Sequence, residues 1–210
     1  MTLQDIRNTP IRLSTLSSVF PRSKDLAGKA KRMEDAGELI RLKRGMYVVS
    51  PHISHTRISE YLIANHLYGP SYISMHSALR YYGMIPETVH ETISVTSGIA
   101  HRYVNPIGTF RYIHAAPSYY PIGITLEQDE NSTFLIATPE KALCDTLVFL
   151  PNLNLRYRKE LIEYLENDLR LDMDSLSRLD TSIIRDCATV ARKKQILNNL
   201  INIISHEQHI

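Results

Sequence analysis

The sequence predicts an α+β protein with two domains, a small one at residues 1–52 and a larger α/β one at residues 57–210. The 210 residues exceed what one small module needs, and 43% of them are hydrophobic, which suffices for a buried core. Helical and strand-like patterns alternate along the chain. A short polar stretch from Pro51 to Thr56 is expected to link the domains.

Positive charge is concentrated near the N-terminus. Residues 1–57 contain 11 Lys and Arg against 5 Asp and Glu, whereas the remainder contains 13 against 17. Such an imbalance is expected when one domain contacts phosphates and the other does not. A basic face that is merely solvated would give the same counts, so charge alone does not decide between these interpretations.

Three helices are predicted in the first 37 residues. They span Thr2 to Arg7, Leu13 to Val19 and Lys24 to Gly37, with Pro21 as a break and Ser23 as the N-cap of the third. At about 100° per residue, the third helix has an apolar face opposite a cationic face. The apolar face holds Leu26, Ala30, Met33 and Gly37, and the opposite face holds Lys24, Gly28, Lys31 and Arg32.

A basic β-hairpin is predicted directly after these helices. Its strands are Leu39 to Leu42 and Met46 to Val49, and Gly45 supplies the positive φ of the loop. Three helices followed by such a hairpin are typical of a winged helix-turn-helix, in which a helix reads the major groove and the hairpin touches the backbone. The residues expected to contact DNA are Ser23, Lys24, Gly28, Lys31, Arg32, Arg41, Lys43 and Arg44. The alternative is a winged helix that contacts only proteins.

The rest of the chain predicts a mixed or antiparallel sheet with helices. Helices are expected at Arg57 to Tyr68 and Met75 to Tyr82, from Thr138, and throughout the chain from Lys159. The last is expected to cover Val190 to Ile204, with an apolar stripe of Val190, Leu197, Ile201 and Ile204. Strands are expected at Ser71 to Ser74, Thr92 to Thr96, Thr109 to His114, Gly123 to Leu126 and Thr133 to Ala137.

Three stretches of the chain resemble the AbiEi-type antitoxins of type IV toxin–antitoxin systems. The first is Arg41 to Tyr47, the second is Pro70 to Leu79 followed by Tyr82 to Pro86, and the third is Thr138 to Asp145. Together they extend over most of residues 1–150. The resemblance implies a winged helix that represses its own operon by binding double-stranded operator DNA. It also implies a C-terminal domain that neutralises a nucleotidyltransferase-like toxin without forming a stable complex.

Two other functions remain open at this point. One is a stand-alone winged-helix regulator or protein-interaction module without a toxin partner. The other is an enzyme, for which Asp172 and Asp174 have the spacing of a nucleotidyltransferase metal site. No Gly-Ser turn lies upstream of them, so they are expected to cap a helix through Leu176. The acidic run of Glu127, Asp129 and Glu130 is expected to be a solvated hairpin turn, and no catalytic residue, metal or cofactor is predicted.

Several motif residues are expected to have local structural roles. Ser74 is predicted to cap the helix from Met75, and Thr138 to cap the helix that Pro139 begins. Lys141 and Asp145, four residues apart, are expected to form a helical ion pair worth a few tenths of a kcal/mol. Three tyrosines are expected at an interface, namely Tyr72, Tyr81 and Tyr82.

The cysteine content and the length of the apolar runs predict where in the cell the protein is located. Only two cysteines occur, Cys144 and Cys187, and neither belongs to a CxxC motif, so a disulfide framework is not expected and Cys144 is predicted to be a buried helical thiol. No apolar run approaches the roughly 20 residues of a membrane span. The sequence thus predicts a bacterial cytoplasmic protein with no membrane partner.

Overall fold

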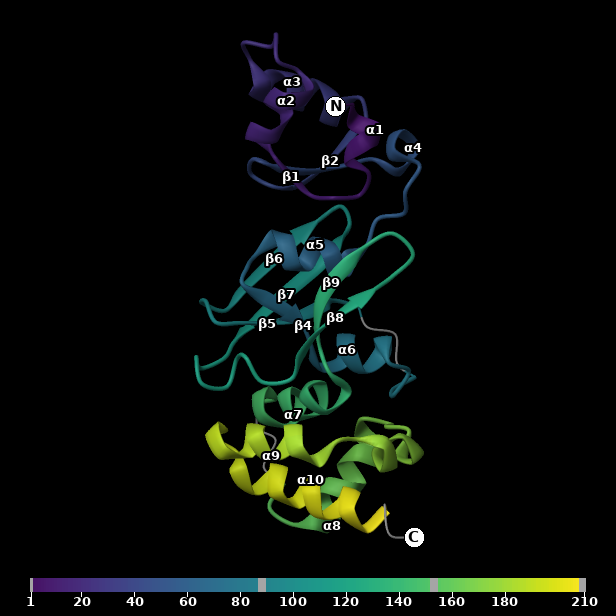
Figure 1. Cartoon of the computed structure of the whole chain (residues 1–210), viewed down its shortest axis with the longest axis vertical. Helices are drawn as coiled ribbons and strands as arrows, with labels where there is room; N and C mark the ends of the chain where they lie inside the picture. Colours follow the sequence, from purple (N-terminus) through teal and green to yellow (C-terminus); the bar gives the residue numbers. More distant parts are fainter. Residues whose placement is uncertain (1, 87–89, 152–154, 208–210) are drawn as a thin grey trace.

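The computed structural model describes residues 2–86, 90–151 and 155–207 and has an α+β architecture. Figure 1 shows three tiers along the long axis: an N-terminal unit, a large central sheet, and a layer of C-terminal helices. A three-stranded antiparallel sheet lies in the first tier, and a six-stranded mixed sheet forms the second. The α+β class predicted from the sequence is therefore confirmed.

The N-terminal unit alternates short helices and strands. Its elements are α1 (Leu3–Ile6), β1 (Ile11–Arg12), the 3-10 turn η1 (Leu13–Thr15), α2 (Leu16–Val19), α3 (Leu26–Asp35), β2 (Leu39–Lys43) and β3 (Met46–Val49). The strand order is β1-β3-β2. The three predicted helices and the hairpin are confirmed, although the second helix is divided between η1 and α2. The two-residue strand β1 was not predicted.

Two apolar cores hold the chain together. The smaller core unites the helices and sheet of the N-terminal unit, with residues Ile6, Ile11, Leu16, Ala30, Met33, Leu39, Tyr47 and Val49. The opposite face of the hairpin contributes Leu42, Met46 and Val48 to the larger core of the second unit. Both faces of β3 are buried for this reason, so its apolar run is continuous rather than alternating.

The segment expected to be a plain linker folds into a helical turn. Helix α4 (Pro51–Ser54) starts with Pro51 at its first position and ends at His55, which has a left-handed conformation. Asn8 then joins α1 to the second unit, because its side-chain amide donates to the carbonyl of Arg57 at 3.0 Å and to Ser132 Oγ at 2.6 Å.

The six strands of the central sheet lie in the order β6-β7-β5-β4-β9-β8. Their bounds are β4 (Ser71–Ile73), β5 (Thr92–Thr96), β6 (His101–Asn105), β7 (Gly108–His114), β8 (Ile124–Gln128) and β9 (Thr133–Ala137). β4–β9 and β5–β7 are parallel pairs, and the other three are antiparallel. Strand β6 was not predicted: it lies at the sheet edge with mostly exposed side chains, so it lacks an apolar alternation.

Helix α5 (Glu60–Leu67) begins after the N-cap Ser59 and packs against β4, β5 and β9. Its buried residues are Leu62, Ile63, Ala64 and Leu67, and Ile58 and Tyr61 are partly buried against the same core. Asn65 is half-buried because its side-chain amide bonds both backbone groups of Leu135, at 2.6 Å and 3.2 Å. The amide thus satisfies part of β9 where it has no strand partner.

The remaining helices close the molecule. They are α6 (Met75–Tyr81), α7 (Pro139–Phe149), α8 (Arg158–Glu163), the π-helical segment η2 (Tyr164–Asp168), the 3-10 segment η3 (Met173–Arg178), α9 (Thr181–Val190) and α10 (Lys194–Glu207). The predicted final helix is confirmed from Lys194 onward, but its expected start at Val190 was wrong, because Val190 ends α9 and is 39% exposed. In α10 the buried residues are Ile196, Leu197, Leu200, Ile203 and Ile204, and Ile201 is half-buried. None of the helices in the described ranges is long and apolar enough to cross a membrane.

Candidate nucleic-acid interface and buried polar cluster

The outer surface of α3 carries exposed positive charge. Lys24, Lys31 and Arg32 are exposed, whereas Ala30 and Met33 on the opposite side are buried. This division follows the amphipathic pattern predicted from the sequence. Within the described chain, neither Lys24 nor Arg32 pairs with a carboxylate, so both charges are available to a partner.

Lys31 differs from its neighbours because it already has a partner. Its Nζ lies 2.7 Å from Asp35 Oδ1, one helical turn further along. The hydrogen bond to Asp35 raises the pKa of Lys31, and both side chains remain about 60% exposed, at 62% and 61%. A phosphate approaching Lys31 must therefore compete with Asp35, so Lys31 is a weaker candidate for phosphate binding than Arg32.

The start of α3 depends on Asp25 rather than on Ser23. Asp25 Oδ1 accepts a hydrogen bond from the backbone N–H of Gly28 at 2.8 Å, so Asp25 is the N-cap and the prediction for Ser23 was wrong. Gly28 has a structural reason for lacking a side chain. A Cβ at Gly28 would lie 1.9 Å from Asp25 Oδ2 and would displace the cap.

The hairpin turn faces the second unit. Lys43 Nζ donates to the carbonyl of Leu67 at the end of α5 and lies 5.5 Å from the ring centre of Tyr103. Burial lowers the pKa of Lys43, and the nearby charge of Arg12 lowers it further. Strand β2 continues through Lys43, so only Arg44 and Gly45 form the turn, and Lys43, which was expected to contact DNA, packs against the second unit instead.

A cationic pocket lies where the hairpin turn meets α5. It has a volume of about 310 Å³ and is lined by Arg12, Lys43, Arg44 and His66 together with backbone and apolar groups. None of the described residues that line it is acidic. Arg12 and His66 were not assigned to the site from the sequence. Strand pairing places Arg12 opposite Met46 of β3 and so brings Arg12 to this pocket. The strand that contains Arg12 has only two residues, so the sequence shows no periodic pattern that would predict it.

Arg41 is the other exposed hairpin cation. It lies on β2 opposite Tyr47, and its side chain is exposed. Of the eight residues predicted to contact DNA, the structure thus leaves Lys24, Arg32, Arg41 and Arg44 exposed and without a carboxylate partner in the described chain.

A second feature is a buried polar cluster around Asp145 of α7. Asp145 Oδ2 accepts hydrogen bonds from Ser74 Oγ at 2.6 Å and Tyr72 OH at 3.0 Å. Lys141 Nζ lies 3.3 Å from Asp145 Oδ1, and both side chains are 0% exposed. Burial raises the pKa of Asp145, while Lys141, Ser74 and Tyr72 oppose that rise. The second and third motifs singled out in the sequence therefore meet at one carboxylate.

The lysine of this cluster is held from three sides. Lys141 Nζ donates to the carbonyl of Tyr119 at 3.0 Å and lies 3.3 Å from the centre of the Tyr119 ring. Thr138 caps α7 as predicted, with its Oγ1 accepting from the backbone N–H of Lys141 at 3.3 Å. The ammonium group is fully buried and has no access to a substrate, and it joins α7 to the turn after β7 that contains Tyr119.

Several expectations for these motifs need correction. Ser74 occupies the N-cap position of α6, but its hydroxyl bonds Asp145 instead of capping the helix. Tyr72 is fully buried and does not line an interface. Cys144 is a buried free thiol as predicted, and burial raises its pKa. Asp172 stands at the N-cap of η3, yet its side chain makes no capping bond.

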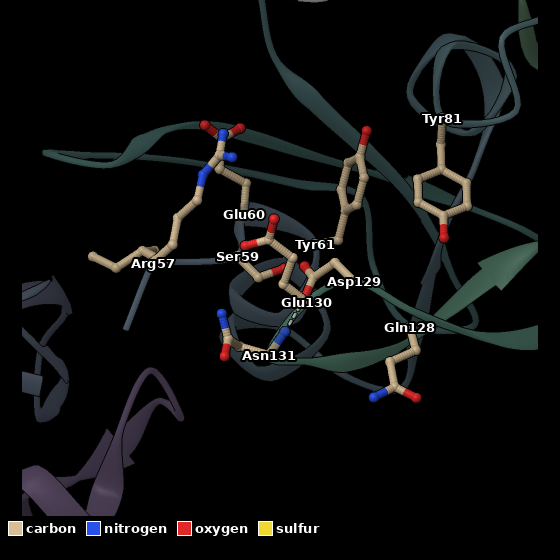
Figure 2. A pocket seen from close by; sticks show the side chains of 10 residues that line it. Arg57, Ser59, Glu60, Tyr61, Tyr81, Gln128, Asp129, Glu130 and Asn131 are labelled. Carbon is tan, nitrogen blue, oxygen red and sulfur yellow. Dashed lines mark hydrogen bonds between the residues drawn. The ribbon is translucent and has the colours of Figure 1, made fainter. Parts of the chain in front are cut away.

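The acidic turn between β8 and β9 borders a cavity of about 510 Å³ (Figure 2). Asp129 Oδ1 accepts from the backbone N–H of Asn131 at 3.1 Å, and this bond shapes the turn as predicted. Figure 2 shows Arg57, Glu60 and Glu130 around the same cavity, with the rings of Tyr61 and Tyr81 at its side. In the parts of the chain that the structure describes, no group of three His, Cys, Asp or Glu side chains is arranged to hold a metal ion.

Comparison with known protein families and with curated proteins found no match to this chain. Its function must therefore be argued from the surfaces described above.

Proposed function

We propose that this protein is a DNA-binding transcriptional regulator and that its N-terminal unit is a winged helix-turn-helix. The order α1, β1, α2, α3, β2, β3 and the antiparallel sheet β1-β3-β2 support this, because three helices are followed by a hairpin, as in a domain of that kind. In the proposal, α3 enters the major groove of double-stranded DNA.

One observation carries the proposal. Arg32 on α3 and Lys24, which lies just before the N-cap Asp25, are exposed with no carboxylate partner in the described chain, while Ala30 and Met33 anchor α3 through its buried face. Cations fixed on a rigid helix bind phosphates well because little side-chain and backbone freedom is lost on binding. Phosphate contacts from Lys24 and Arg32 would supply salt-dependent affinity.

The hairpin has a different role from the helix in this proposal. Lys43 of the hairpin donates to the carbonyl of Leu67 in α5, so the hairpin does not project from the molecule by itself. A phosphate beside the hairpin would instead meet the cationic pocket, where Arg12 and Arg44 are exposed and Lys43 and His66 lie next to them. The hairpin and the second unit thus present one joint surface to the DNA backbone.

The second unit is proposed to neutralise a nucleotidyltransferase-like toxin encoded beside this gene, as the resemblance to AbiEi-type antitoxins implies. Tyr72, Ser74, Lys141 and Asp145 are excluded from direct contact with a toxin in this account, since all four are fully buried or nearly so. Residues that oppose the toxin must therefore lie on exposed parts of the sheet or the C-terminal helices.

The DNA-binding proposal is tested with a fluorescent duplex spanning the protein's own promoter. The double variant Lys24→Ala/Arg32→Ala should lose most of the affinity at 0.1 M salt. The matched control is Arg158→Ala/Arg178→Ala, which removes two exposed arginines at the far end of the molecule and should bind as wild type. Equal binding by the α3 variant and the wild type would refute the proposal.

The antitoxin part has its own test. The full chain is co-expressed with the neighbouring nucleotidyltransferase-like gene, and growth is compared with that of cells expressing the toxin alone. Restored growth supports the antitoxin proposal. Growth arrest in the presence of the stable, DNA-binding chain would leave a stand-alone regulator in its place.

A further inference from the structure

A cavity in the second unit, far along the chain from the DNA-binding surface, has the features of a small-molecule site. It has a volume of about 600 Å³ and lies between the end of β7, the C-terminus of α7 and the connection from α9 to α10. Ligand pockets in proteins fall in the range of roughly 300–1,000 Å³. The cavity is therefore large enough to enclose a ligand of ordinary size.

One part of its wall is apolar. Val148 and Phe149 come from the last turn of α7, and Val190 comes from the end of α9. The Phe149 ring is fixed edge-on against the Tyr119 ring at a centroid distance of 5.5 Å. Val190 is 39% exposed although it sits beside these side chains, so an apolar ligand would remove its surface from water.

The other part of the wall is cationic. Arg192 is exposed and has no carboxylate partner in the described chain. Lys193 Nζ donates to the carbonyls of Leu147 at 3.1 Å and Leu150 at 2.9 Å, and this leaves one of its three N–H groups free. Its charge also complements the C-terminal end of α7.

His114 also lines the cavity. Its Nδ1 lies 2.7 Å from the carbonyl oxygen of Gly98, so Nδ1 is the donor and Nε2 is left for a ligand. Among the described residues that line the cavity, none is Asp or Glu. The positive charges of Arg192 and Lys193 therefore have no acidic partner in the cavity wall. The charge of the wall favours a negatively charged ligand.

We propose that this cavity binds a small amphipathic carboxylate, such as a medium-chain fatty acid. The carboxylate would lie between Arg192 and the free N–H of Lys193, and the chain would cover Val148, Phe149 and Val190. A nucleotide fits less well, because the aliphatic wall would oppose its sugar and phosphates. This site does not depend on the proposed DNA-binding function, since it uses none of the same residues.

The test is calorimetric titration of the full-length protein with sodium decanoate below its critical micelle concentration. The expected result is saturable binding of one decanoate per chain. Arg192→Gln should weaken this binding by about tenfold or more, because it removes a charge-assisted hydrogen bond to the carboxylate. Arg178→Gln, an exposed arginine outside the cavity, is the matched control and should leave the affinity unchanged.

Two further measurements separate the charge from the apolar wall. Decanol, which has the same chain without the carboxylate, should bind at least tenfold more weakly. Val190→Trp should fill the mouth of the cavity and abolish binding, and circular dichroism checks that this partly exposed position tolerates the change. Absence of saturable decanoate binding overturns the proposal, as does equal affinity for the wild type and the Arg192→Gln variant.

Discussion

Asp145 is the residue on which the packing of the second unit depends most. It accepts hydrogen bonds from Tyr72 and Ser74 and neutralises Lys141, with all of these groups buried. The sequence places Lys141 and Asp145 four residues apart, which predicts a weak surface pair. The few tenths of a kcal/mol expected for such a pair do not apply, because a buried charge that loses its partner is strongly destabilising.

Asp145→Ala is therefore expected to lower the free energy of unfolding by about 3–5 kcal/mol. The substitution leaves the ammonium of Lys141 buried without a counter-charge and removes the acceptor of two hydroxyl groups. Urea denaturation measures the loss. Asp174→Ala, at an exposed position, serves as the control and should change the stability by no more than about 0.5 kcal/mol. A loss below about 1 kcal/mol for Asp145→Ala would contradict the structural role.

Arg32 and Lys31 are adjacent cations that should contribute unequally to DNA binding. Arg32 has no carboxylate partner in the described chain, whereas Lys31 is paired with Asp35. Arg32→Gln is expected to weaken promoter binding roughly tenfold at 0.1 M salt, the effect of one lost phosphate contact. Lys31→Gln should weaken it by a smaller factor, as measured by fluorescence anisotropy. A larger loss for Lys31→Gln would mean that Asp35 releases Lys31 on binding.

Elements with strong periodicity were the predictable ones. Helix α3, the β2–β3 hairpin and the strands β5, β7 and β9 have bounds close to those expected, since apolar spacing and turn residues mark them. The short strand β1 and the edge strand β6 were missed. A two-residue strand has no period, and an edge strand has few buried positions, so tertiary pairing alone creates both.

The candidate site residues likewise divide into those that the sequence predicts and those that only the three-dimensional fold brings together. The exposure of Lys24, just before α3, and of Arg32, on the outer face of α3, was predictable from the amphipathic pattern. The contact of Lys43 with Leu67 was not, because it depends on how the hairpin packs against α5. The convergence of Ser74 and Asp145, 71 residues apart, also arises only from the three-dimensional fold.

The hairpin turn depends on Gly45, whose φ is +72°. Gly45→Ala should lower the stability by about 1–2 kcal/mol, because a Cβ is disfavoured in the left-handed region. No atom lies within 4 Å of the added Cβ, so the effect is conformational rather than steric. Gly108→Ala is the matched control: its surroundings are equally open and its φ is not positive. Equal stability of the two variants in urea denaturation would contradict this view of the turn.

The two units of the molecule share a core. Leu42, Met46 and Val48 belong to the hairpin but are buried against the second unit, and Asn105 donates to the carbonyl of Leu42 at 3.2 Å. The packing of the hairpin and the packing of the central sheet therefore depend on each other. Cutting the chain after the hairpin would expose part of the larger core.

Deletion of residues 1–50 tests this coupling. The truncated chain should lose promoter binding, and its thermal midpoint should fall by roughly 5 °C or more because three buried side chains are removed from the larger core. Differential scanning calorimetry measures the midpoint, and growth rescue measures any remaining antitoxin activity. An unchanged midpoint would mean that the units are energetically independent.

The account as a whole depends on a cationic surface, built from α3 and the hairpin, that binds the DNA backbone. The most direct test is the salt dependence of promoter binding by the wild type and by Lys24→Ala/Arg32→Ala. Two lost phosphate contacts should reduce the slope of log K against log salt by about 1.8. The same slope for both proteins would contradict the account.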